Sequence, residues 1–340
     1  MQFLKNLFGK SGEPPRVDLN RRFELLSRVG QGTMSRFFKA RDTRTGRVVG
    51  LKILDPEKLQ KYEARFPPQF KKPTEGEIAC SLQHPQVIRT FEWGYSTAGE
   101  QFLVMEFLDA VGLTFLIDVQ NDFFQQHRLA LIIQLGEGLA YLHSQKFIYR
   151  DLCPSNVLVT QPGGELKLID FGLAVPNTPP FQAPGNRTGK ANYMAPELAR
   201  RQKTDQRIDL FSYAVTCFEM FTRRHPWPEA KSLESVVQHM NSPPASLTNL
   251  CPTIDPRVAA IIMRGLAREP HERWPSAEAM VAELGRCTPQ AAASALDAAK
   301  GDIKLAVLLR AGLGLAKARA LLKRHDGRLR AALAEIGAGS

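Results

Sequence analysis

Apolar and polar positions alternate with the two-residue period of β-strands in the first third of the chain. Five apolar-rich runs predict strands there, at residues 23–29, 36–40, 48–54, 87–93 and 101–107. Thr45-Gly46 predicts a hairpin between the second and third runs, and a helical stretch leads to Leu82. This part of the chain is therefore predicted to form a small sheet with a helix.

The pattern changes to the helical period after Asp109. The strongest helix is expected over residues 129–145, where leucines follow one another at spacings of three and four. A chain of 340 residues exceeds the usual single core, so two or more packed units are expected. The fold class is α+β, with a sheet-rich lobe followed by a larger helical one.

A third unit begins near Thr288. It is predicted to contain three short helices, at about residues 291–299, 303–310 and 316–323, and an amphipathic run at 329–336. Two interpretations remain open. The unit is either a module for protein interaction or dimerisation, or a cap packed on the large lobe.

The first ten residues carry apolar side chains at helical spacing, together with Lys5 and Lys10. They indicate either an anchor on a membrane surface or a partner, or a terminus without stable structure, because ten residues make a marginal helix in water. The stretch has no small-residue cleavage site and is not expected to be a secretory signal.

The composition, with 44% apolar and 23% charged residues, is typical of a soluble globular protein. No apolar run approaches the roughly 18 residues of a membrane span. Five cysteines without paired spacing favour a reducing, cytoplasmic compartment over a disulfide framework. The net charge is +11, but the basic residues are scattered, so no nucleic-acid partner is expected.

Three motifs lie in order between Tyr149 and Glu197. They are Y-R-D-L-C-P-S-N from residue 149, D-F-G from residue 170 and A-P-E from residue 195. The first two provide Asp151, Asn156 and Asp170. Phosphoryl transfer from ATP needs such a set, with one carboxylate to orient the attacking hydroxyl and an Asp and an Asn to hold magnesium.

On these motifs, the chain resembles the eukaryotic-like serine/threonine protein kinase family of bacteria over about residues 23–286. The resemblance implies a bilobal protein-kinase fold that uses ATP and Mg²⁺. The small lobe, an antiparallel sheet with one helix, would span residues 23–108, and the mainly helical large lobe residues 109–286. Residues 1–22 would form an N-terminal tail and residues 287–340 a C-terminal helical module.

Within that module, residues 297–306 resemble the Gly-Asp turn of small ubiquitin-associated-like three-helix modules. The whole tail is also similar to the helical C-terminal segment of bacterial N-acetylmuramic acid phosphate etherases. The resemblance makes self-association or partner binding through this tail an expectation.

The family's phosphate loop corresponds to G-Q-G-T-M-S, which begins at Gly30. Gly30 and Gly32 let the backbone approach phosphates and offer its N–H groups. Ser35 stands where the family has a third glycine. Twenty residues after Gly32, Lys52 lies inside an apolar strand, where an ammonium group needs an anionic partner.

In kinases the partners of this lysine are the ATP phosphates and a helix glutamate. Glu75 has the family's spacing to His84-Pro85, and Glu77 is the alternative, on a different face of the helix.

The resemblance implies an adenine site with Val29, Phe37 and Gly50 above the base and Leu158 below it. The linker would lie along the edge of the site, and it consists of Met105, Glu106, Phe107 and Leu108. The family usually has Val and Ala where this chain has Phe37 and Gly50. We interpret the exchange as a volume-conserving repacking; in the alternative interpretation, Phe37 partly fills the purine pocket.

The resemblance assigns Asp151 as the catalytic base, Lys52 as a catalytic lysine, and Asn156 and Asp170 as Mg²⁺ ligands. It also implies that Arg150 pairs with a phosphorylated activation loop.

Thr178 and Thr188 are the candidate acceptors in that loop. Two structural contacts are expected as well: an ion pair between Glu197 and Arg273, and a carboxylate, Asp209, that holds the catalytic loop through backbone N–H groups.

Two positions depart from the family. The lysine two residues after the catalytic Asp is Cys153 here, and the threonine three residues before the tyrosine of Y-M-A-P-E is Lys190. Because the two positions touch in the family fold, we infer that Lys190 is a third catalytic residue and supplies the missing ammonium. The alternative is decay towards a pseudokinase that acts as a scaffold through its C-terminal helices.

Overall fold

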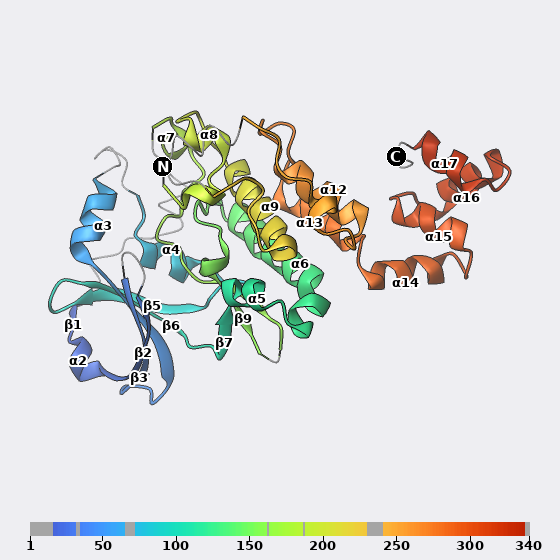
Figure 1. Cartoon of the computed structure of the whole chain (residues 1–340). Coiled ribbons are helices and arrows are strands. Elements are labelled where there is room, and N and C mark those ends of the chain that lie inside the picture. Colours follow the sequence, from blue (N-terminus) through green and yellow to red (C-terminus); the bar gives the residue numbers. More distant parts are fainter. Residues whose placement is uncertain are drawn as a thin grey trace.

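The structure is a computed structural model, and it describes residues 16–31, 35–64, 72–161, 163–185, 188–229 and 241–336. The amphipathic start at residues 1–15 and the loop residue Gly32 lie outside the described residues. Figure 1 shows a sheet-rich lobe, a helical lobe and a C-terminal group of helices that extends away from the helical lobe.

The small lobe is built on one sheet with the strand order β1-β5-β6-β4-β3-β2. The strands are β1 (Arg16–Val17), β2 (Phe23–Gln31), β3 (Ser35–Asp42), β4 (Val48–Leu54), β5 (Thr90–Ser96) and β6 (Gln101–Glu106). Every neighbouring pair is antiparallel except β1 and β5. The predicted hairpin joins β3 to β4, with Gly46 at φ 72°.

The structure extends the small lobe beyond the expected start at residue 23. Val17 belongs to its apolar core. Arg22, 7% exposed, forms ion pairs with Asp42 at 2.9 Å and with Glu92 at 2.7 Å. A buried arginine needs such partners, so residues 16–22 are part of this lobe rather than of a tail.

Helices lie beside the sheet, where a single one was expected. They are α2 (Leu19–Arg22), α3 (Pro56–Glu63) and α4 (Glu75–Ser81). The strand expected at residue 87 begins at Thr90 instead, because Val87 pairs with Leu168 of the large lobe in an isolated bridge. The apolar run of Val87 and Ile88 therefore joins the two lobes.

The large lobe is mainly helical. Its helices are α5 (Leu113–Val119), α6 (Asp122–Ser144), α7 (Pro179–Gln182), α8 (Pro196–Ala199), α9 (Arg207–Thr222), α11 (Leu247–Leu250), α12 (Pro256–Gly265) and α13 (Ala277–Gly285), with the 3-10 turns η1 (Pro154–Asn156) and η2 (Ala191–Tyr193). Short strands frame the catalytic segment: β7 (Ala110–Gly112), β8 (Phe147–Ile148), β9 (Val157–Thr160), β10 (Leu166–Leu168) and β11 (Val175–Pro176).

The core of this lobe lies around α6 and α9. The predicted leucine stripe of α6 is fully buried, and Asn121 caps the helix by accepting a hydrogen bond from the Phe124 N–H at 2.9 Å. No helix among the described residues combines the length and apolar character that crossing a membrane requires.

The C-terminal helices have an apolar cluster of their own. They are α14 (Pro289–Ala298), α15 (Ile303–Arg310), α16 (Leu315–Arg324) and α17 (Leu329–Glu335), close to the predicted positions. Their buried side chains, Leu308 and Ala318 among them, form a cluster separate from that of the large lobe. The described part of the C-terminal segment therefore has an apolar core of its own.

Candidate active site

The Lys52 ammonium lies between two carboxylates. Its Nζ is 2.5 Å from Glu75 Oε1 and 3.1 Å from Asp170 Oδ1. Burial disfavours the charged lysine, but Asp170 and Glu75 outweigh burial and raise the pKa of Lys52 above its ordinary value. The Lys52 ammonium of β4 therefore forms ion pairs with both α4 and the D-F-G segment.

The start of α4 explains why Glu75, and not Glu77, is the partner. Thr74 caps the helix through its side-chain oxygen, and the Glu77 carboxylate accepts a hydrogen bond from the Thr74 N–H at 2.7 Å. This reciprocal capping box uses Glu77. Glu75, on another face, is left to turn towards Lys52.

Asp151, Asn156 and Asp170 converge at the end of the catalytic loop. The amide nitrogen of Asn156 donates to Asp151 Oδ2 at 2.7 Å and to the Asp151 carbonyl at 2.8 Å. The amide oxygen of Asn156 has no hydrogen bond to the residues that the structure describes, so it can face a ligand. Burial raises the pKa of Asp151 to about 6.

The donor set around Asp170 fits magnesium. A carboxylate and an amide oxygen are hard ligands of the kind that Mg²⁺ takes together with substrate phosphates. Within the described ranges, no three or more His, Cys, Asp or Glu side chains are grouped so that they could hold a metal. A magnesium ion here would therefore need the substrate phosphates as further ligands. A Cβ on Gly172 would lie 3.2 Å from Asp170 Oδ1 and 3.3 Å from Glu75 Oε2, so the glycine keeps both carboxylates uncrowded.

A buried carboxylate fixes the catalytic loop from beneath. Asp209, fully buried in α9, accepts hydrogen bonds from the backbone N–H groups of Tyr149 at 2.8 Å and Arg150 at 2.7 Å. Arg150 has φ 68°, a left-handed conformation that a side chain disfavours. The two hydrogen bonds hold this strained turn, which orients the neighbouring Asp151.

The expected ion pair of the large lobe is present. Arg273 forms two hydrogen bonds of 2.7 Å with the Glu197 carboxylate and is 1% exposed. Three backbone carbonyls accept the remaining donors of Arg273. The contact anchors α8, and with it the segment that precedes the A-P-E motif.

Lys190 lies beside the catalytic loop, as its position predicts. Its Nζ is 3.1 Å from Cys153 Sγ and also donates to the hydroxyl of Ser155. Gly189, with φ 108°, permits this approach, because a Cβ there would lie 2.8 Å from the Arg150 carbonyl oxygen. The Lys190 charge offsets part of the rise that burial causes in the pKa of Asp151, and it adds to the larger effect of Lys52, which lowers the pKa of Asp170.

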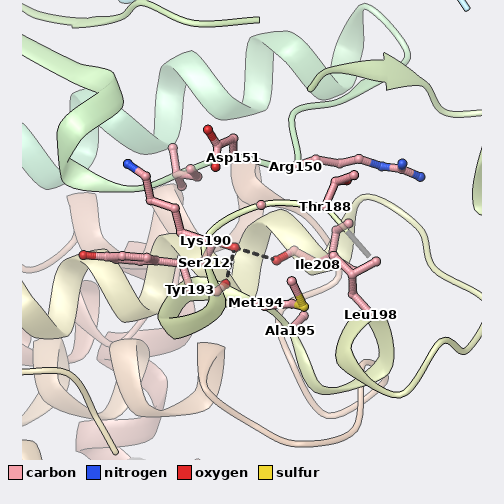
Figure 2. A pocket seen from close by; sticks show the side chains of 12 residues that line it. Arg150, Asp151, Thr188, Lys190, Tyr193, Met194, Ala195, Leu198, Ile208 and Ser212 are labelled. Atoms are coloured by element: carbon pink, nitrogen blue, oxygen red, sulfur yellow. Dashed lines mark hydrogen bonds between the residues drawn. The ribbon is translucent and has the colours of Figure 1, made fainter. Parts of the chain in front are cut away.

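Figure 2 shows the side chains of Lys190 and Arg150 extending in opposite directions, to either side of Asp151. Arg150 is 5% exposed and donates to the Phe181 carbonyl of α7. Its Nε and Nη1 find no hydrogen-bond partner within the part of the chain that the structure describes, and neither does the buried Thr188 hydroxyl. Thr178, the other candidate acceptor, is half-buried at the start of α7.

The residues expected around adenine lie on facing strands and in the linker. Gly50 pairs with Met105 across β4 and β6, and Phe37 lies on the adjoining strand β3. A Cβ on Gly50 would lie 2.7 Å from Phe37 Cζ and 3.0 Å from Met105 Cγ. The aromatic ring thus reaches the space that a larger residue at position 50 would need, as both interpretations of the exchange require.

The other expected residues surround this group. Val29 on β2 is 53% exposed, Leu108 packs on the core, and Leu158 is half-buried on β9. Gly30 and Ser35 lie at facing ends of β2 and β3, on either side of Gly32. Glu106 Oε1 accepts from Lys167 Nζ at 3.0 Å and from the Arg89 N–H, and the Glu106 N–H donates to the Arg89 carbonyl at 2.9 Å.

Replacing Gly50 with alanine should lower the melting temperature and weaken nucleotide binding, because the new methyl group meets the Phe37 ring. The double variant Gly50→Ala/Phe37→Val restores the family pair and should recover both, since the two volumes compensate. Thermal denaturation with and without Mg-ATP measures both effects. Equal losses in the single and double variants would contradict the repacking.

Sequence reasoning missed two polar neighbours of the site. Lys72 donates to the Gly172 carbonyl at 3.3 Å, and burial lowers its pKa to about 8. His143 of α6 places Nε2 2.9 Å from Asp209 Oδ2. Neither contact has a local signature, because each joins residues more than 60 positions apart.

Comparison with known proteins agrees with this geometry. Residues 23–284 match the protein kinase domain family. The chain belongs to this family.

Its relatives include a probable serine/threonine-protein kinase of Streptomyces coelicolor, 29% identical over 81% of this chain and 41% of the relative. The probable serine/threonine-protein kinase PknB of Corynebacterium glutamicum is 28% identical over 81% of this chain and 43% of its own length. PrkC of Bacillus subtilis is 25% identical over 77% and 40%. This kinase-family chain therefore spans about two fifths of the length of these curated relatives.

Proposed function

We propose that this protein is a serine/threonine protein kinase that transfers the γ-phosphoryl group of Mg-ATP to protein hydroxyls, its own included. The observation that carries the proposal is the convergence of Asp151, Asn156 and Asp170 beside the buried Lys52–Glu75 pair. A pseudokinase needs no such complete set. The similar bacterial proteins are known or probable serine/threonine-protein kinases, which supports the proposal.

Each member of the set has a role that its surroundings favour. The Asp151 carboxylate orients the attacking hydroxyl and accepts its proton, and Lys52, held by Glu75, binds the nucleotide phosphates. Asp170 and the amide oxygen of Asn156 would hold magnesium, which offsets charge on the phosphates. Lys190 places an ammonium group near the transferred group, where the family has a lysine at the position of Cys153.

Phosphorylation of the activation loop is proposed to engage Arg150. The guanidinium is buried beside α7 with two donor atoms left over among the described residues, and a phosphate is a strong acceptor for it. Thr178 is the more accessible acceptor, because Thr188 is 5% exposed. We further propose a cytoplasmic location, on the ground that all five cysteines are free thiols.

Transfer of radiolabelled phosphate to a generic protein substrate tests the function. Turnover should rise with pH and level off above about 6, because Asp151 accepts a proton only as the carboxylate and burial holds its pKa near that value. With an unshifted pKa the rise would lie near pH 4. Asp151→Asn should lose transfer by about a hundredfold or more at every pH.

Absence of transfer by the unmodified protein across this pH range, with Mg-ATP bound, would favour the scaffold alternative. A rise centred near pH 4 would leave the kinase assignment intact but remove Asp151 as the titrating base.

A further inference from the structure

The C-terminal module contains the same helix pair twice, 26 residues apart. Helices α14 and α16 begin at Pro289 and Leu315, and α15 and α17 begin at Ile303 and Leu329. We call residues 289–310 the first unit and residues 315–335 the second unit.

The turns inside the two units agree bond for bond. Lys300 and Asp326 have φ 53° and 51°, and the glycines that follow, Gly301 and Gly327, have φ 83° and 73°. The Gly301 N–H donates to the Leu296 carbonyl at 3.0 Å, and the Gly327 N–H donates to the Leu322 carbonyl at 2.8 Å. Both helices thus end in a left-handed residue other than glycine that is followed by a left-handed glycine, so the two units share one local design.

The first unit covers one face of the second. Helix α15 packs against α16. Leu322 and Leu329 pack against the shared apolar cluster, which includes Leu305 and Leu308 of the first unit. Lys304 Nζ donates to the carbonyl of the turn glycine Gly327 at 2.8 Å. This face of the second unit, Leu322, Gly327 and Leu329, is thus closed by an amphipathic helix that carries a cation.

The same face of the first unit is open. The counterparts of Leu322 and Leu329 are Leu296 and Ile303, which are 40% and 70% exposed. The counterpart of Gly327 is Gly301, which is exposed as well. Leu296, Gly301 and Ile303 form what we call the open face. Removing the side chains of Leu296 and Ile303 from water would be favourable. Leu322 and Leu329 gain the same kind of burial where the first unit covers them.

The second unit carries the matching surface. The counterpart of Lys304 is Arg330, on α17, and it is exposed. Beside it, Ala331 and Ala334 take the places of Leu305 and Leu308. Within the described residues this surface has no further unit to cover, so each chain carries one open face and one spare covering surface.

We propose that the open face of one chain is covered by the second unit of another copy, with α17 in the place of α15 and Arg330 donating to the Gly301 carbonyl. Because face and covering surface are different patches, the contact is head-to-tail. The alanines of α17 bury less apolar area than the leucines of α15, so the association is weak and rises with protein concentration.

Sedimentation of the full chain over a range of concentrations tests the proposal, without reference to catalysis. The apparent mass should rise above that of a monomer. Ile303→Asp and Arg330→Glu should each raise the dissociation constant by about tenfold or more, since each removes a central contact. Both positions are exposed, so the units should keep their helix content.

Matched controls separate the contact from general surface effects. Phe91→Asp places the same charge at an apolar position of the small lobe that is 54% exposed, and Arg319→Glu reverses a charge on α16. Neither should change the association.

Mixing the two interface variants distinguishes a head-to-tail contact from a symmetric one. Ile303→Asp keeps its covering surface and Arg330→Glu keeps its open face, so an equimolar mixture should form a dimer and stop there. A mixture that stays monomeric while the unmodified chain associates would overturn the head-to-tail arrangement. An unmodified chain that stays monomeric at all concentrations would overturn the proposal.

Discussion

Asp170→Ala should abolish most of the magnesium-dependent stabilisation that ATP gives to this protein. A ligand that binds the native state raises the melting temperature. At a concentration of one hundred dissociation constants, it raises the free energy of unfolding by about 2.7 kcal/mol. Asp170 lies 3.1 Å from Lys52 and is the proposed charged metal ligand, so the variant should respond to ATP almost equally with and without magnesium. Phosphate transfer should fall by about a hundredfold or more.

Asp297→Ala, which removes an exposed carboxylate of α14, is the control and should behave as the unmodified chain does. The outcome that contradicts the assignment is a stabilisation by Mg-ATP that survives in Asp170→Ala. If millimolar Mg-ATP fails to stabilise even the unmodified protein, Phe37 fills the purine pocket, and the kinase proposal fails with it.

Local patterns predicted the elements and many of the site's contacts. The α4 helix illustrates how far they reach: the Thr74-x-x-Glu77 box is visible in the sequence, and it would have assigned Glu77 to the cap and Glu75 to Lys52. The Glu197–Arg273 and Asp209 contacts followed from the family's motifs. All three depend on residues with fixed places in a local element or a motif.

Contacts between distant segments were not predictable in the same way. Arg22 reads as a surface residue at the end of a tail, yet Asp42 and Glu92 enclose it. Lys72 stands beside a proline and reaches the Gly172 carbonyl one hundred residues away. The repeat in the C-terminal module could not be predicted from composition, because Ala- and Leu-rich helices resemble one another. It becomes evident when the backbone turns at Gly301 and Gly327 are compared.

Lys190→Ala should lower turnover by about a hundredfold or more while ATP affinity changes little. A cation beside the transferred phosphoryl group offsets charge that builds in the transition state, so its loss appears mainly in kcat. The position is favourable for this role, since the Lys190 ammonium is 3.1 Å from Cys153 Sγ and its charge acts on both Asp151 and Asp170. Steady-state kinetics with varied ATP separate the two effects.

Variants at the two exchanged positions test the origin of the effect. Cys153→Lys together with Lys190→Thr restores the family arrangement and should recover much of the lost rate, because it moves the same charge across a contact of 3.1 Å. Cys153→Lys alone places two ammonium groups side by side and should gain nothing. Ser155→Ala removes only a hydroxyl that Lys190 contacts, and its effect should be small. Turnover of Lys190→Ala at the parent rate would show that this lysine takes no part in transfer, and the thiol at position 153 would then stand without a compensating charge.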